Sequence, residues 1–286
     1  MAGTDLQRSS FSPFWIAFVA LAGAAGCSSS LTTLQPARTV PAGHLQIGGS
    51  VQVTPPTGLP GDTYEAVRDI SGLGNNPTPA QVEQVAESAT AALVQPPSLD
   101  AQASLAYGVT RRLELDARVG ATSAGVGFRL QWLRRKPGIY GALGFMVNVN
   151  FQQFPVERFT DEVEIESFRR QDFAVPLVLG YSRQRVHLWA GPKLVISRFD
   201  TEVGVCLDDS CQDIRLRASG RATYVAGQFG IAIGSGRAWF ALEMTVARAH
   251  VQADFDVEMP RRPSMEADTE RRGRVLTPAI GLILWI

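Results

Sequence analysis

Hydrophobic and polar residues alternate strictly along residues 113–119, which read LELDARV. The charged residues Glu114, Asp116 and Arg118 stand at every second position, with aliphatic residues between them. Successive side chains of an extended strand point to opposite faces, so this period of two predicts a strand whose faces meet different solvents.

Nine further segments read as strands, most of them with the same alternation. They are residues 45–53, 99–107, 125–133, 140–152, 173–181, 186–196, 223–233, 238–246 and 275–286. The sequence therefore predicts about ten strands, with eight or twelve as the alternatives.

The connections between these segments alternate between short turns and long polar stretches. Short turns are expected near Thr110, Lys136-Pro137, Arg183-Gln184 and Ser235-Gly236, and the long stretches are 54–98, 153–172, 197–222 and 247–274. One connection on the long side, near Thr122-Ser123, is short. Short periplasmic turns and long external loops are typical of barrels that span outer membranes. An even number of turn residues brings the apolar faces of neighbouring segments together, and two-residue turns satisfy this condition.

Over residues 44–286 the chain resembles the outer-membrane β-barrels of Gram-negative bacteria. Aromatic residues fall on the apolar faces at both ends of the strands: Tyr107, Trp132 and Tyr181 at the short turns, Phe151 and Phe173 at the long loops. Such barrels carry aromatic belts at both membrane interfaces. The closing AIGLILWI resembles their C-terminal targeting segment, although it ends in Ile286 rather than in an aromatic residue.

The resemblance implies an all-β, antiparallel transmembrane barrel in the cell outer membrane. Outer-membrane lipid would surround it, and the long loops would lie outside the cell. A soluble periplasmic β-sandwich lipoprotein is the alternative, because its strands alternate as well.

The N-terminus carries an export signal. Residues 14–26 form an apolar run, preceded by Arg8 and followed by Cys27 and several serines. This resembles a bacterial lipoprotein signal, in which small residues precede a cysteine that becomes lipidated, although Ala24 replaces the usual leucine. We therefore expect a signal peptide over 1–26, a periplasmic tether over 27–43 and the barrel over 44–286. Ordinary cleavage near residues 22–24 and an uncleaved anchor are the alternatives.

Charge and cysteine content narrow the function classes. Lys plus Arg equals Asp plus Glu at 27 each, which gives no reason to expect a nucleic-acid partner. In an oxidising compartment Cys206 and Cys211, within CLDDSC, are expected to form a disulfide in an external loop. The nearby aspartates lack the spacing of a calcium loop, and no zinc spacing occurs, so no metal or cofactor is expected.

One segment has helical rather than strand periodicity. Residues 78–93 place apolar side chains at intervals of three and four, between Pro79 and Pro96. We expect a short helix in the first long loop, which either caps the barrel mouth or folds into the lumen, and we favour the cap.

Candidate catalytic residues are few. His250 is expected at the outer end of the strand 238–246, with Asp254 and Asp256 in the adjoining loop, where they could form the site of a rim hydrolase. The sequence has no HExxH, no GxSxG and no phosphate-binding glycine loop. The main expectation is therefore a non-enzymatic barrel, either a structural or binding element or a narrow solute conduit.

Charged residues on inward faces predict a blocked or very narrow lumen. They are Glu114, Asp116, Arg118, Arg129, Lys193 and Glu243. A hairpin around Thr122-Ser123 would set Asp116 opposite Arg129, Glu114 opposite Gln131 and Arg118 opposite Gly127. A lumen lined with both signs of charge predicts low conductance, which should rise when Asp116 or Arg129 is truncated to alanine.

Overall fold

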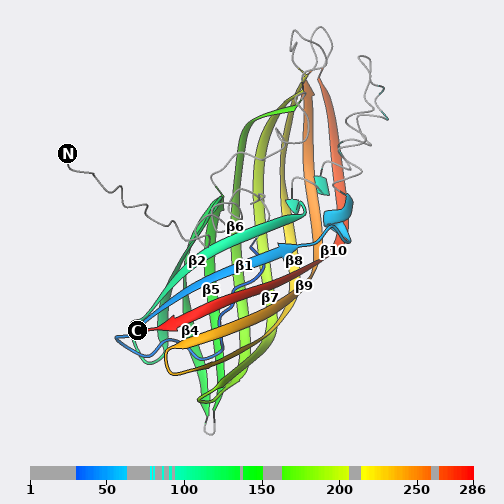
Figure 1. The fold of residues 1–286 in the computed structure, drawn as a ribbon. Coiled ribbons are helices and arrows are strands. Elements are labelled where there is room, and N and C mark those ends of the chain that lie inside the picture. The colour runs from blue at the N-terminus through cyan, green and yellow to red at the C-terminus, as the bar shows by residue number, and fades with distance from the viewer. Residues whose placement is uncertain are drawn as a thin grey trace, which may run out of the picture.

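Ten antiparallel strands close into one barrel in the computed structural model of this chain (Figure 1). The structure describes residues 30–62, 78, 80, 86, 90, 91, 94–135, 138–150, 163–205, 214–258 and 264–286. Its strands are β1 (Leu45–Thr54), β2 (Ser98–Gly108), β3 (Leu113–Gly120), β4 (Ser123–Arg135), β5 (Ile139–Asn150), β6 (Val163–Ser182), β7 (Val186–Val205), β8 (Ile214–Ser235), β9 (Ala238–Glu258) and β10 (Met265–Trp285). A single 3-10 turn, η1 (Leu59–Gly61), follows β1. The predicted all-β antiparallel barrel of ten strands is confirmed.

No helix among these residues is long and apolar enough to cross a membrane.

Each strand pairs with its neighbours in sequence, and the first strand closes the ring with the last. Residues Gln46–Gln52 of β1 pair with Ala279–Trp285 of β10. The closed ring leaves no free strand edge at this level, so every backbone group of the wall can be paired.

The outward face of this closed part is an apolar belt, because the strands keep the alternation that the sequence predicts. Among the outward side chains Leu115 is 50% exposed, Val126 65% and Leu282 59%. The inward positions between them hold buried polar residues such as Gln52, Asp100 and Thr277. The fold is that of an outer-membrane β-barrel, with its wet and apolar faces exchanged relative to a soluble protein.

Strands β6–β10 continue far beyond β1–β5 and form a wall on one side of the mouth (Figure 1). They have 20 to 22 residues each, against 8 to 13 in β1–β5. The expectation that 153–172, 197–222 and 247–274 are loops is therefore largely wrong, since most of these residues belong to strands.

The cause of this error is a reversal of polarity along the strands. In β9 the outward residues change from Leu242 and Val246 to Arg248 and Asp254, while the inward residues become small or apolar, such as Ala253 and Phe255. Beyond the apolar belt the outer face meets water and the inner face is covered by protein. The alternation continues through this region with its sign reversed, and a search for outward apolar residues does not detect it.

The described residues near the end of the first long loop pack on the inner face of this wall. Ala80, Ala86, Thr90, Ala91 and Val94 have helical backbone, and the other residues of the predicted helix 78–93, apart from Thr78, lie outside the described set. Ala86, Ala91 and Val94 pack in one apolar cluster with inward residues of the wall. Gln95, just after the predicted helix, donates to Thr54 at the end of β1, 3.4 Å away, so this end of the loop lies at the mouth.

The predicted turns differ in detail. The turns expected at Arg183-Gln184 and Ser235-Gly236 lie one residue later, at Gln184-Arg185 and Gly236-Arg237. β3 and β4 pair with residue numbers that sum to 243, not 245, because the turn is Ala121-Thr122. The turn at Lys136-Pro137 has three residues, 136–138, and a bulge between Gln131 and Leu133 restores the alignment of the faces.

Candidate functional site: the lumen and the segment that fills it

Residues 30–43, expected as a tether, are called the threaded segment below; residues 30–41 lie inside the barrel and residues 42–43 are exposed at its short-turn end. The segment begins at the short-turn end, where the Gly43 nitrogen donates to the Gly108 oxygen at 2.8 Å. It ascends the lumen to Thr32, whose hydroxyl donates to Gln52 at 2.6 Å, two residues below the outer end of β1. Leu31, Thr32, Thr39 and Val40 are all buried.

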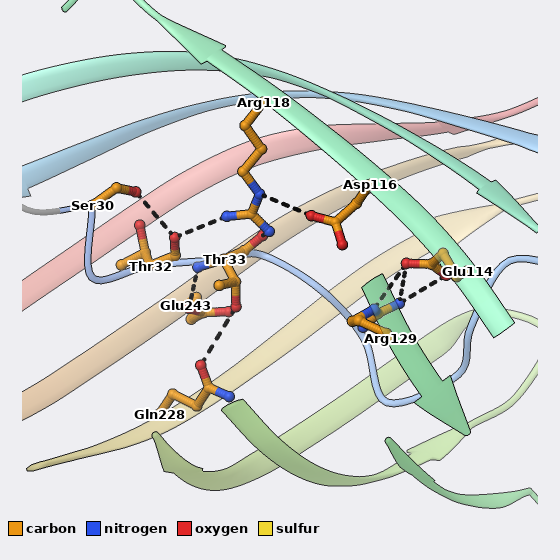
Figure 2. Close-up of polar contacts among 9 residues, drawn as sticks. All are labelled: Ser30, Thr32, Thr33, Glu114, Asp116, Arg118, Arg129, Gln228 and Glu243. Atoms are coloured by element: carbon orange, nitrogen blue, oxygen red, sulfur yellow. Dashed lines mark hydrogen bonds and ion pairs between the residues drawn. The ribbon is translucent and has the colours of Figure 1, made fainter. Parts of the chain in front are cut away.

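The lower part of the segment is held by a buried ion pair. The Arg129 guanidinium contacts the Glu114 carboxylate at 2.8 Å, with 2% and 0% of the two side chains exposed (Figure 2). Arg129 also donates to the Pro36 oxygen at 2.7 Å, and Glu114 accepts from the Val40 nitrogen at 2.6 Å. Because both side chains also bind the backbone of the threaded segment, they supply hydrogen-bond partners to backbone groups that are not paired in the sheet.

A second set of contacts grips the upper part of the segment. Arg118 donates to the oxygens of Thr32 and Thr33 at 3.3 and 3.0 Å (Figure 2). Glu243 accepts from the Thr33 nitrogen at 2.8 Å and from the Trp189 indole at 3.0 Å. Strands β3 and β9, which are not neighbours in the ring, thus both bind Thr33.

Lys193 completes the grip at the end of the segment. Its ammonium group donates to the Leu31 oxygen at 2.6 Å, and the Thr245 hydroxyl donates to the same oxygen at 3.3 Å. Strands β7 and β9 therefore fix the same carbonyl.

All six predicted lumen charges are buried inside the barrel. The expected pairing of Asp116 with Arg129 is wrong: Arg129 lies opposite Glu114, and Asp116 lies opposite Gly127. Asp116 instead approaches Arg118 of its own strand, at 3.9 Å. A register shift of two residues keeps every side chain on its face, so the pattern of faces could not distinguish the two pairings.

An apolar layer closes the lumen beside these charges. Leu34 and Ala37 of the segment pack with the inward residues Trp189, Trp239 and Ile283. A buried cluster lies above, at the mouth: Arg170 pairs with Asp172 at 2.9 Å and donates to the Tyr224 hydroxyl at 3.3 Å and to the Val94 oxygen. The lumen is thus filled by the chain itself at both levels.

Sequence reasoning missed the threaded segment because residues 30–43 have neither strand nor helix periodicity. Its one signal is indirect. The strands carry inward charges and amides that their paired neighbours cannot all satisfy, so another polar partner had to enter the lumen.

The residues of the candidate rim hydrolase do not converge. His250, Asp254 and Asp256 all lie in β9, not in a loop, and their side chains point outward. Asp254 is four positions after His250, which puts the two about 13 Å apart along the strand, beyond hydrogen-bonding reach.

The carboxylate beside His250 is Glu270, with Nε2 of His250 3.0 Å from its Oε1. Arg272 donates a hydrogen bond to Glu270 at 2.6 Å and thereby lowers the pKa of this carboxyl, with His250 adding to the effect. All three side chains are largely exposed beyond the apolar belt.

Cys27, Cys206 and Cys211 lie outside the described residues. Val205 and Ile214 pair at the tip of the β7–β8 hairpin, so the two later cysteines belong to the connection 206–213. Within the part of the chain that the structure covers, no group of His, Cys, Asp or Glu side chains could hold a metal ion.

Comparisons with protein-family models and with curated protein sequences find no match. Among solved structures, the outer membrane protease OmpT of Escherichia coli is similar, with a TM-score of 0.45, 8% identity, and coverage of 90% of this chain and 100% of that one. Neisserial surface protein A (NspA) has a TM-score of 0.31 and 9% identity over 84% of this chain and 95% of its own. The RagAB peptide importer has a TM-score of 0.32 and 10% identity, with coverage of 86% of this chain and 40% of its own. These likenesses concern the barrel fold alone.

Proposed function

We propose that this chain is a non-enzymatic outer-membrane β-barrel lipoprotein whose lumen is closed by its own threaded segment. The observation that carries the proposal is the position of residues 30–43, held in the lumen by Glu114, Arg118, Arg129, Lys193 and Glu243. A buried, hydrogen-bonded plug of this kind favours a structural or binding element of the cell surface over a solute conduit.

The apolar belt supports placement in the outer membrane, since exposed side chains such as Val126 and Leu282 require lipid contact around the whole ring. The wall formed by β6–β10 and the loop 206–213 would then project from the cell and carry any binding function. Cys206 and Cys211 are expected to close that loop by a disulfide.

We do not favour the rim-hydrolase hypothesis, because its candidate catalytic residues are spread along the outward face of one strand. Catalysis by a general base requires hydrogen-bonding reach between the base and its partner groups. His250, Asp254 and Asp256 do not have it.

The experiment that tests the proposal is single-channel recording of the intact protein in planar bilayers. We expect no steady conductance, because two layers of buried side chains and backbone block the lumen. A large, stable conductance in the unmodified protein would assign it to the channel class instead.

The path of the segment also changes the expected position of a lipid on Cys27. Cys27 is three positions before Ser30, and three residue steps span at most about 11 Å. Lys193, which binds Leu31, is seven residues above the start of β7, about 23 Å along the strand from the short-turn end. With the segment in the lumen, the lipid would therefore lie on the long-loop side and not in the periplasmic leaflet.

This position can be checked on intact cells. An epitope inserted at residues 28–29 should be accessible from outside, and the same epitope at the exposed turn residue Gly236 should be accessible only after the outer membrane is permeabilised. The reverse pattern would show that the segment leaves the lumen when Cys27 is anchored, or that the barrel is inverted.

A further inference from the structure

One end of the barrel carries arginine at every turn and no acidic residue. Seven arginines lie in the four short turns or at the strand end beside one, and they are called the short-turn arginines below: Arg111, Arg112, Arg134, Arg135, Arg183, Arg185 and Arg237. All seven are exposed. Neither Asp nor Glu occurs in the surrounding stretches 36–46, 106–113, 131–142, 178–189, 232–240 and 281–286.

No ion pair of a short-turn arginine occurs within the described residues, in contrast to the other end of the barrel. There Arg217 lies 3.3 Å from Glu202 and 3.7 Å from Glu258, and Arg272 lies 2.6 Å from Glu270. Arg217 and Arg272 at the long-loop end are thus paired with carboxylates of the chain, whereas the short-turn arginines are left for an external anion.

The placement of the short-turn arginines identifies the kind of anion. They occupy all four hairpins, β2–β3, β4–β5, β6–β7 and β8–β9, and so surround the barrel instead of forming a patch on one side. A protein partner would cover one side, but a lipid leaflet meets the whole circumference.

The arginines also adjoin the apolar belt. Arg134 and Arg135 follow the outward Trp132, which is 49% exposed, and the Arg183 guanidinium lies 5.6 Å from the centre of the Tyr181 ring. Aromatic rings of this kind lie at the level of lipid headgroups. A guanidinium just beyond them can bind a phosphate oxygen pair through two parallel hydrogen bonds.

We propose that the short-turn arginines form a ring that binds the phosphate headgroups of anionic phospholipids in the leaflet at that end of the barrel. The proposal rests on the function proposed above, in which the barrel spans the outer membrane. It adds a ligand class and a site, and it predicts that the protein enriches anionic lipid around one rim only.

Trp132 can report this binding, because it faces lipid beside Arg134 and Arg135 while Trp189 and Trp239 are buried in the lumen. The full mature chain is inserted into phosphatidylcholine vesicles that contain a minor fraction of brominated lipid, either phosphatidylglycerol or phosphatidylcholine. Brominated phosphatidylglycerol should quench Trp132 more strongly, with a local preference of roughly fivefold per contacting arginine. High salt should reduce this preference, because it screens exposed charges.

The variant Arg134→Gln/Arg135→Gln should bring the two quenchers to equal efficiency. The matched control Arg248→Gln/Arg274→Gln removes the same charge at the opposite rim and should keep the preference. Equal quenching of the unmodified protein, or a preference insensitive to salt, would overturn the proposal even if the arginine variant fails to insert. A chain that inserts into neither vesicle would contradict the transmembrane placement instead.

Discussion

A variant that lacks residues 31–40 is expected to admit ions into a barrel that is otherwise closed. The deletion removes Leu31, which binds Lys193, and the backbone groups of Thr33, Pro36 and Val40 that bind the lumen charges. With the segment gone, the charged inward faces should hydrate, since they lose these backbone partners and both signs of charge favour water. Planar-bilayer recording should show a conductance absent from the unmodified protein.

The first loop supplies the control. Val94 and Gln95 cover the mouth, so a variant lacking residues 78–95 loses the upper layer while the threaded segment still fills the lumen below. We expect this variant to remain closed and the combined deletion to conduct most. If removing residues 78–95 alone opened the barrel, the seal would lie at the mouth and the threaded segment would have another role.

Replacing Arg129 by methionine is expected to lower the free energy of unfolding by about 3–5 kcal/mol, because it leaves the Glu114 carboxylate buried without its cation. Glu114 is fully buried and would retain only the Val40 nitrogen as a partner among the contacts described above. Denaturant unfolding of the protein in vesicles, followed by tryptophan fluorescence, measures the loss.

The double variant Glu114→Gln/Arg129→Met should recover most of this loss, since an uncharged pair has no unpaired charge to bury. A matched double-mutant cycle combines Asp116→Asn with Arg129→Met and measures the coupling energy between Asp116 and Arg129. Asp116 approaches Arg118 and not Arg129, so this coupling should be the smaller one. A larger coupling to Asp116 than to Glu114 would restore the register that the hairpin prediction implied.

The sequence predicts the faces of the strands well and their pairing less well, for a physical reason. Each residue of the wall faces either lipid or the lumen, whatever strand it pairs with. The inward position of Glu114 and Arg129 can therefore be predicted from their immediate neighbours in the sequence. Their partnership depends on the turn, and Ala121-Thr122 differs from the expected turn by one residue, which moves the pairing by two.

The outer ends of the strands and the path of the threaded segment could not be predicted from the local pattern of apolar and polar residues. In β9 the residues after Val246 continue as strand although their outward side chains turn from apolar to charged, because lipid gives way to water. The threaded segment has no period at all. Its conformation is set by Arg118 and Arg129 of the neighbouring strands β3 and β4 and by Glu243 of the distant strand β9.

The closed wall has a consequence for the order of folding. The segment immediately precedes β1, and its hydrogen bonds to Glu243 and Thr245 span 210 and 214 residues of chain. Contacts of such sequence separation form late, because a long loop must close before they contribute. Its contacts to β3 and β4 span less chain, so we expect the segment to lie against these strands first and to gain its contacts to β9 as β10 joins β1. Folding then ends by closing the seam between β1 and β10 around a segment already in place, so that the wall and its plug are completed in the same step.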